Sequence, residues 1–202
     1  MSWDTLADDE TLERTVKALK ERGIEVMVVS NGEEAREKVL ELIPKGAEVM
    51  EASSATLNEI GVIKDLEESG EYRSLKKEIT SINDAQKRNE FRRKSAIPEY
   101  EIGSVHAVTE YGEVLIASAT GSQLAPYVFG AANVIWVVGT QKIVKNLDDA
   151  FRRLREYTFP LEDARMKKTY GAGSGINKIL IFDKEVVPNR VKLIFVKEKL
   201  GF

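Results

Sequence analysis

The sequence predicts an α/β domain in which helices alternate with the strands of a mostly parallel sheet. Apolar residues recur at helical spacing within several charged segments, and short runs of β-branched residues separate those segments. Three such runs between residues 103 and 144 end in clusters of Gly, Ser and Thr with charged or amide side chains. Alternation of this kind is typical of strand–helix–strand units, and binding sites lie at their strand ends.

The composition indicates one globular domain spanning residues 1–202. Hydrophobic residues make up 43% of the chain and charged residues 31%, a balance that supports a substantial core. The net charge is −3, with 30 basic and 33 acidic residues, so the chain lacks the basic excess of a dedicated nucleic-acid binder. We therefore expect no nucleic-acid partner.

The absence of cysteine and the single histidine exclude several kinds of metal and redox site. The sequence contains no cysteine, which excludes disulfides, cysteine-bound zinc and iron–sulfur clusters held by this chain alone. Its single histidine excludes a multi-histidine metal site within one subunit. No apolar run approaches the ~20 residues of a membrane helix, and the N-terminus has no secretory signal. We expect a cytoplasmic protein with no metal, no cofactor and no membrane contact.

The first quarter of the chain predicts a helix, a strand, a second helix and a second strand. Helical spacing dominates the N-terminal region 1–22, and an apolar run at 24–30 reads as a strand. Asn31 is placed to cap the next helix, and a short strand follows at 47–52. We expect a βαβ unit whose two strands form a parallel pair.

The middle of the chain is charged and helical before it turns to strands. Asn83 or Asp84 is expected to cap a long helix that ends near Pro98. Beyond it lie the three strands of the region 103–144, with Tyr111-Gly112 marking a hairpin or tight turn.

The last quarter predicts a helix at 148–157, a mobile loop at 160–177 and two strands at 178–183 and 191–196. We expect these two strands to form an antiparallel pair at the edge of the sheet. The loop contains Gly171, Gly173 and Gly175, but no helix follows them, so they do not form a dinucleotide fingerprint.

The first candidate binding site follows the strand at 47–52. Ser53, Ser54 and Thr56 stand at a strand-to-helix turn, where hydroxyls and free N–H groups can bind a phosphate or carboxylate. The same residues can also be ordinary helix caps.

His106 and Glu110 are the candidate catalytic residues. A histidine titrates near neutral pH and suits acid/base work, and Glu110 is the acidic residue nearest to it in sequence. A buried structural histidine and a glutamate that closes the turn are the alternatives.

Two later strand ends complete the set of candidate residues. Lys142 can supply positive charge to an anion, although a lone lysine is usually a surface residue. The ligand-binding candidates beyond residues 53–56 are Thr109, Gly121, Ser122, Gln123, Gly139, Gln141 and Lys142. A basic cluster on the helix around Arg92 reads as a solvated face or as a surface for a partner.

Several of these motifs together resemble the LUD domain family of LutC/YkgG-like lactate-utilisation proteins. The matching pieces are Ser53-Ser54-Ala55-Thr56-Leu57, Val105-His106-Ala107-Val108-Thr109-Glu110, Gly121-Ser122-Gln123-Leu124, Val134-Ile135-Trp136-Val137-Val138-Gly139 and Gln141-Lys142-Ile143-Val144. The combined pattern is specific, whereas each piece alone is not. Many relatives carry Gly-Asn-Arg where this chain carries Gly121-Ser122-Gln123.

The resemblance implies the three-layer α/β/α fold of the NagB/RpiA/CoA-transferase-like superfamily, with sugar-phosphate or CoA-type ligands at the strand ends. It also implies a role in oxidising L-lactate to pyruvate beside iron–sulfur partner proteins. We therefore expect an accessory protein that binds a small anionic metabolite and that can form a homo-oligomer. The alternative is a stand-alone isomerase or acyl/CoA-transferase-like enzyme that uses Glu110 and His106.

Overall fold

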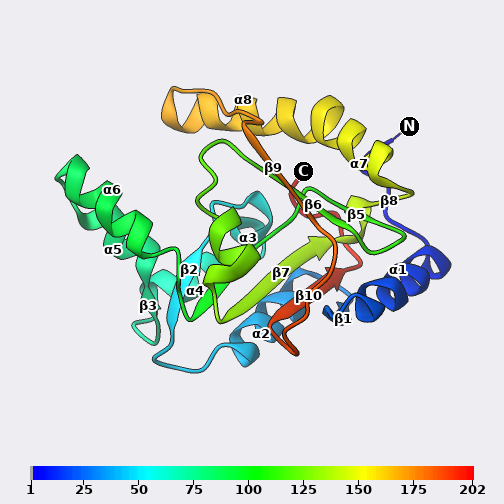
Figure 1. The fold of residues 1–202 in the computed structure, drawn as a ribbon, viewed down its shortest axis with the longest axis horizontal. Coiled ribbons are helices and arrows are strands. Elements are labelled where there is room, and N and C mark those ends of the chain that lie inside the picture. Colours follow the sequence, from blue (N-terminus) through cyan, green and yellow to red (C-terminus); the bar gives the residue numbers. More distant parts are fainter. Residues whose placement is uncertain (1) are drawn as a thin grey trace.

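The computed structural model describes residues 2–202, the side chain of residue 170 excepted, and its core is a six-stranded parallel sheet (Figure 1). Helices cover this sheet in the manner of a three-layer α/β/α domain, which confirms the expected fold class. A second sheet of four strands lies against one face of the first. Residue 1, part of the expected N-terminal region, lies outside the described residues.

The helices and strands follow one another as the sequence alternation predicts. The strands are β1 (Glu25–Val29), β2 (Glu48–Glu51), β3 (Arg73–Ser74), β4 (Tyr100–Gly103), β5 (Ala107–Thr109), β6 (Val114–Ser118), β7 (Asn133–Gly139), β8 (Ile143–Val144), β9 (Lys178–Phe182) and β10 (Val191–Val196). The α-helices are α1 (Asp9–Glu21), α2 (Gly32–Leu42), α3 (Ala55–Glu59), α4 (Val62–Glu68), α5 (Leu75–Ser81), α6 (Ala85–Lys94), α7 (Leu147–Arg153) and α8 (Phe159–Tyr170). Short helices η1 (Pro126–Gly130), η2 (Thr140–Lys142) and η3 (Leu154–Thr158) complete the chain.

The predicted helix caps at Asn31 and Asp84 are confirmed by the structure. Asn31 accepts a hydrogen bond from the N–H of Glu34 at the start of α2, and Asp84 accepts one from Lys87 at the start of α6. Such caps satisfy backbone donors that a helix leaves free at its N-terminus. These helix starts are therefore encoded by a few neighbouring residues.

The central sheet has the strand order β1-β10-β7-β4-β2-β3, and every pairing in it is parallel. Along β7 the side chains alternate: Val134 and Trp136 join one hydrophobic cluster, while Ile135 and Val137 join another on the opposite face. A strand buried on both faces needs apolar residues at every position, which explains the unbroken apolar run in this part of the sequence.

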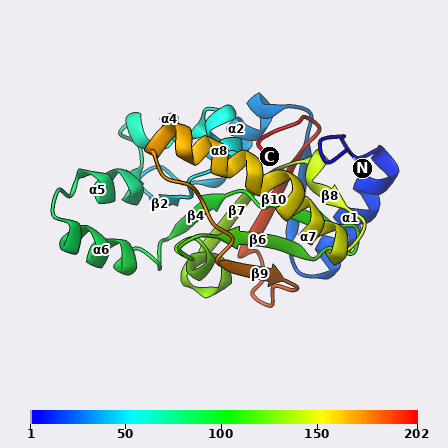
Figure 2. The ribbon, with the colours of Figure 1, turned by 90° about the horizontal axis from the view of Figure 1, so that it is seen from above.

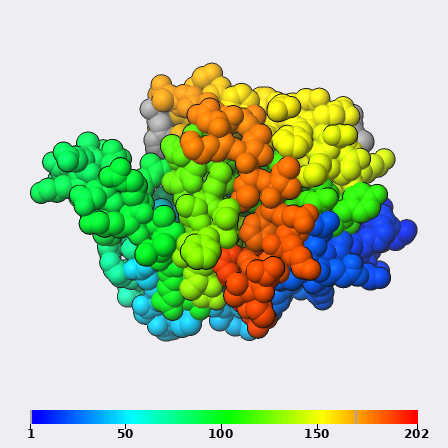
Figure 3. Space-filling view, viewed as in Figure 1, coloured from blue at the N-terminus to red at the C-terminus, as the bar shows by residue number. Residues whose placement is uncertain are grey.

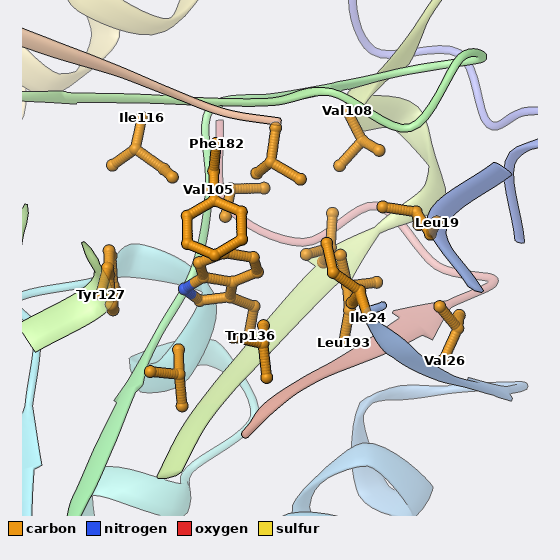
Figure 4. Close-up of a cluster of buried hydrophobic side chains, with 14 of the residues drawn as sticks. Leu19, Ile24, Val26, Val105, Val108, Ile116, Tyr127, Trp136, Phe182 and Leu193 are labelled. Atoms are coloured by element: carbon orange, nitrogen blue, oxygen red, sulfur yellow. The ribbon is translucent and has the colours of Figure 1, made fainter. Parts of the chain in front are cut away.

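Trp136 occupies the middle of the cluster between the two sheets (Figure 4). Its ring meets Tyr127 and Phe182 edge to face, with centroids 5.5 and 5.3 Å away. Such perpendicular contacts suit the charge distribution of aromatic rings. The cluster thereby joins η1, β7 and β9, three segments far apart in sequence.

The second sheet has the order β8-β5-β6-β9 and lies between the central sheet and the helices α7 and α8. The expected turn at Tyr111-Gly112 joins β5 to β6 as an antiparallel hairpin, and Gly112 has a φ of +88°. A Cβ on Gly112 would approach the carbonyl carbon of Ala18 to 2.9 Å, so the turn also packs against α1.

Two expectations about strand pairing are wrong. β1 and β2 are not neighbours, because β10, β7 and β4 lie between them. The last two strands do not form an antiparallel edge pair: β10 pairs in parallel with β1 and β7, and β9 pairs with β6 in the other sheet. Pairing depends on which apolar faces meet in three dimensions, and neighbouring residues carry little information about this.

The expectation of a loop over the whole of 160–177 is also wrong. Residues from Leu147 to Tyr170 form α7, η3 and α8 without interruption, and Figure 2 shows this helical run lying across the second sheet. Pro160 lies in the first turn of α8, directly after the π-type turn of η3, where the backbone hydrogen-bond pattern changes. A proline at this position is therefore compatible with the helix.

Candidate functional site

A cavity of about 520 Å³ opens at the carboxyl edge of the central sheet. Its floor is formed by residues that follow β2, β4 and β7, and the loop after β6 forms one wall. Another wall comes from α5 and α6, which project from the body of the molecule (Figures 1 and 3). The carboxyl edge of a parallel sheet is where ligands of such folds bind, because the loops there are free to vary.

Lys142 is the most unusual residue of this cavity. It lies in η2 just after β7, and only 3% of it is exposed. Its Nζ donates hydrogen bonds of 3.0 Å to Thr56 Oγ1 and to Ser104 Oγ. Among the described residues, none forms an ion pair with it, although a buried charge is normally paired.

The surroundings of Lys142 disfavour its charged form. Burial, together with the nearby Arg153 guanidinium, lowers the pKa of the Lys142 ammonium to about 7, whereas Glu59 acts in the opposite direction. The ammonium and the amine therefore coexist near neutral pH. A bound anion would favour the ammonium and restore the missing counter-charge.

His106 lines the same cavity as a neutral donor. Its Nδ1 accepts a 3.2 Å hydrogen bond from the N–H of Ala117, which leaves the proton on Nε2. Burial lowers the pKa of His106 to about 3, and the positive charges of Lys142 and Arg153 contribute to the shift. His106 thus offers an Nε2–H group to a ligand throughout the physiological pH range.

Arg153 holds the backbone of His106 in place. It is fully buried in α7, and its guanidinium donates to the main-chain oxygen of His106 at 2.5 Å and to Thr158 Oγ1 at 3.0 Å. It also donates to the main-chain oxygens of Trp3 and Phe202, both at 3.3 Å. Burial lowers the pKa of Arg153 to about 10, so the guanidinium stays charged and adds positive potential beside the cavity.

The first candidate cluster lies at the cavity, where it also has structural roles. Ser53, Ser54 and Thr56 all line it. Ser54 caps α3 by accepting from the N–H of Leu57, as the capping alternative expected. Thr56 Oγ1 lies between Lys142 and the main-chain oxygen of Leu200, to which it donates at 3.3 Å.

The Gly121-Ser122-Gln123 turn contributes two of its three residues to the cavity wall, Ser122 and Gln123. The hydroxyl of Ser122 accepts a 2.9 Å hydrogen bond from Arg92, which ties α6 to this turn. Gln123 is held inside the protein, where it accepts from Ser118 Oγ and donates to the main-chain oxygen of Ala117. Gly121 lies outside the cavity, and its N–H donates to Ser118 Oγ.

Four further candidates lie away from the cavity lining. Gly139 and Gln141 hold the C-terminal segment, because Gln141 Nε2 donates to the oxygen of Leu200 at 2.8 Å. Thr109 bonds to Glu113 within the hairpin turn. Glu110 forms a 3.0 Å ion pair with Arg14 of α1.

Glu110 and His106 are therefore not brought together at the cavity, since only His106 lines it. The described residues contain no group of three His, Cys, Asp or Glu side chains that could hold a metal ion. None of their helices combines the length and apolarity needed to cross a membrane.

The sequence reasoning missed several residues of the cavity. Ser104, which follows β4, carried the same strand-end signal as the residues that were chosen. Arg153 had no such signal, because an arginine on an amphipathic helix usually faces water. Lys76, Arg88 and Arg92 line the mouth, and none of the three forms an ion pair within the described part of the chain.

Two buried carboxyl groups also line the cavity, on β2 and β4. Burial raises the pKa of Glu51 to about 7, and Ser74 donates a 3.1 Å hydrogen bond to it. Burial raises the pKa of Glu101 well above the usual value, and the neighbouring Glu51 adds to the effect. Burial therefore disfavours the negative charge of both carboxyl groups.

Comparison with known proteins identifies the family of this chain. The family model of the LUD domain matches residues 12–196. The chain is similar to the crystal structure of a DUF162 family protein from Deinococcus radiodurans, with a TM-score of 0.59 and 12% sequence identity over 95% of this chain and 99% of that one. This likeness shows the fold alone.

A second solved structure is more distant. The eIF2B beta of Chaetomium thermophilum has a TM-score of 0.41 and 13% identity, over 69% of this chain and 49% of that one. No curated protein matches the sequence.

Proposed function

The chain belongs to the LUD domain family, and from that premise we propose that its cavity binds a small anionic metabolite. We further propose that the ligand is a carboxylate and that the protein is an accessory component of lactate utilisation or of related carboxylate metabolism. The family is associated with lactate utilisation, which supports this choice of ligand.

The unpaired lysine carries the proposal. Removing an ammonium group from water costs several kcal/mol, and proteins usually offset that cost with a carboxylate partner. Lys142 has hydroxyl partners and no carboxylate partner within the described residues. A ligand carboxylate in the cavity would supply the missing charge, and the adjacent Nε2–H of His106 would give it a neutral donor.

The mouth of the cavity favours the same sign of ligand. Lys76, Arg88 and Arg92 surround it from α5 and α6. Cations that line a concave entrance raise the local concentration of anions and speed their association. Both the entrance and the floor therefore favour a negatively charged ligand.

Isothermal titration of the purified protein with L-lactate and pyruvate tests the proposal. We expect saturable binding by the wild-type protein and its loss in Lys142→Met. Lys145→Met is the matched control, because Lys145 is exposed and lies outside the cavity. A ligand at 100 times its dissociation constant should also stabilise the fold by about 2.7 kcal/mol. Absence of saturable binding by the folded wild-type protein would reject the proposal.

The pH dependence of binding provides a second test. The charged groups around Lys142 are Arg153 and Glu59, with the neutral His106 beside them. Because the pKa of Lys142 is about 7 and an anion binds the ammonium, affinity should fall as the pH rises above 7. The pKa of His106 near 3 makes its titration irrelevant in this range. An affinity that is constant from pH 6 to pH 9 would contradict the role of Lys142.

We also propose that the accessory role involves iron–sulfur redox partners and that the chain can self-associate. A reconstitution measures the first part: lactate oxidation by purified iron–sulfur proteins of lactate utilisation, with and without the chain. We expect the chain to raise the rate, and no change on its addition would remove the accessory role. Sedimentation of the purified chain measures its oligomeric state.

A further inference from the structure

We propose that Lys142 also acts as a nucleophile, forming an imine with the carbonyl group of a 2-oxo carboxylate bound in the cavity. The inference deepens the proposed function and rests on it, because the carboxylate must first bind beside this lysine. The substrate class is thereby narrowed from carboxylates in general to those that carry an adjacent ketone or aldehyde.

The hydrogen bonds around Nζ prepare the amine for attack. Thr56 Oγ1 donates its one proton to the oxygen of Leu200, and Ser104 Oγ donates its proton to the oxygen of Val137 at 2.7 Å. Each hydroxyl can therefore only accept from Lys142. A neutral amine satisfies both hydroxyls with its two N–H groups, and its lone pair is left without a partner among the described residues.

Lys142 borders the cavity in which the substrate would bind. It lines the cavity wall although almost all of its surface is buried. A side chain added at Gly201 would bring a Cβ within 3.3 Å of Nζ and 2.4 Å of Thr56 Oγ1. Glycine at this position therefore lets the C-terminal segment pack closely against Thr56 and Lys142.

The environment keeps a reactive fraction of amine at neutral pH. Burial and the nearby Arg153 place the pKa of Lys142 at about 7, whereas an exposed lysine is almost entirely protonated there. Desolvation next to a second cation is a known way to activate a lysine for carbonyl chemistry. Glu59, the carboxylate that opposes the shift, forms no ion pair with Lys142 within the described residues.

The covalent step balances without an oxidant or reductant. The Nζ lone pair adds to the carbonyl carbon of the substrate, and the C=O π pair moves to oxygen, which takes a proton to give a carbinolamine. The hydroxyl then takes a second proton and leaves as water, while the nitrogen lone pair forms the C=N bond. One proton is released from nitrogen, so amine, carbonyl and one proton become an iminium ion and water.

Neighbouring groups suit this step. The Nε2–H of His106 is a neutral donor on the cavity wall and can hydrogen-bond to the substrate oxygen. The iminium nitrogen keeps a positive charge, so the substrate carboxylate retains its counter-charge after the bond forms. The hydroxyls of Thr56 and Ser104 can still accept the single remaining N–H.

Borohydride trapping tests the proposal directly. The folded protein is incubated with pyruvate, treated with sodium borohydride, digested and mapped by mass spectrometry. Hydride addition to an iminium leaves a stable carboxyethyl group on the lysine. We expect one such group on Lys142, formed about 100-fold faster than on the exposed Lys145, because binding holds the reactants together. L-Lactate, which has no carbonyl group, should form no adduct and should slow labelling by pyruvate.

The outcomes separate this inference from the proposed function. Saturable pyruvate binding without an adduct on Lys142, or with labelling spread evenly over exposed lysines, overturns the imine and leaves anion binding intact. Absence of binding by the wild-type protein rejects both. Lys142→Arg keeps the positive charge but cannot form the imine, so it should bind pyruvate and yield no adduct. If this variant does not fold, the position of the adduct in the wild-type protein decides whether Lys142 forms the imine.

Discussion

Replacing Lys142 with methionine should make the protein more stable while removing its anion site. The folded-state pKa of about 7 lies below the ordinary lysine value of 10.5, so the unfolded chain binds more protons between pH 7 and pH 10.5. At pH 7 this difference costs the folded state about 4 kcal/mol, an upper bound at 1.36 kcal/mol for each pH unit. Methionine has no charge to bury and therefore avoids the cost.

The loss of two hydrogen bonds opposes this gain. Thr56 and Ser104 lose a donor each but keep their own donated bonds, so we subtract about 1 kcal/mol for each of the two contacts. The net expectation is a stabilisation of about 2 kcal/mol at pH 7. For a chain of this size that raises the melting temperature by about 4–8 °C.

Urea unfolding of both proteins at pH 7 and pH 10 measures the effect. The free energy of unfolding of the wild-type protein should rise relative to that of Lys142→Met as the pH rises from 7 to 10. The reason is that the unfolded wild-type chain loses its extra proton on Lys142 over this range. Lys145→Met is the control and should stay within about 0.5 kcal/mol of wild type, since Lys145 is exposed. A Lys142→Met protein that is less stable than wild type at pH 7, with an unchanged pH slope, would refute the reasoning.

Three further changes test the packing and the ion pairs. Trp136→Ala should lower the free energy of unfolding by about 3–5 kcal/mol, because it empties the centre of the core, and a loss under 1 kcal/mol in urea unfolding would contradict the assignment. Glu185→Gln should cost about 3–5 kcal/mol by leaving the buried Arg190 without its carboxylate partner at 2.6 Å, and thermal melts that match wild type would show that the pair contributes nothing. Arg153→Met should cost about 3 kcal/mol in the same melts and also weaken pyruvate binding, since it releases the main-chain oxygen of His106; unchanged affinity would mean that Arg153 does not position the site.

The helix starts and the strand ends could be predicted because each depends on neighbouring residues. Asn31 and Asp84 cap the helices that directly follow them. Ser54 and Lys142 each follow a strand of one parallel sheet, and the carboxyl ends of such strands share an edge. Once the chain alternates between helix and strand, their meeting at one cavity follows from chain direction.

The partners of Lys142 and the support of His106 could not be predicted in the same way. Arg153 sits 47 residues from His106 in the chain, and its contact with the His106 oxygen exists only because α7 packs on β5. Glu110 is four residues from His106, yet it leaves the cavity and pairs with Arg14. Sequence distance did not predict the cavity residues here, because the β5–β6 hairpin packs against α1 and brings Glu110 to Arg14.

By itself, the sequence determined that this is an α/β domain with polar strand ends, since apolar periodicity and capping residues act over a few positions. Only the tertiary structure decided that β10 lies between β1 and β7 in one sheet while β9 joins another, and that Lys142 is buried with no carboxylate partner among the described residues. The physical reason is the range of the interactions. Hydrogen bonds within a helix are local, whereas strand pairing and the desolvation of a charge depend on segments that meet only after folding.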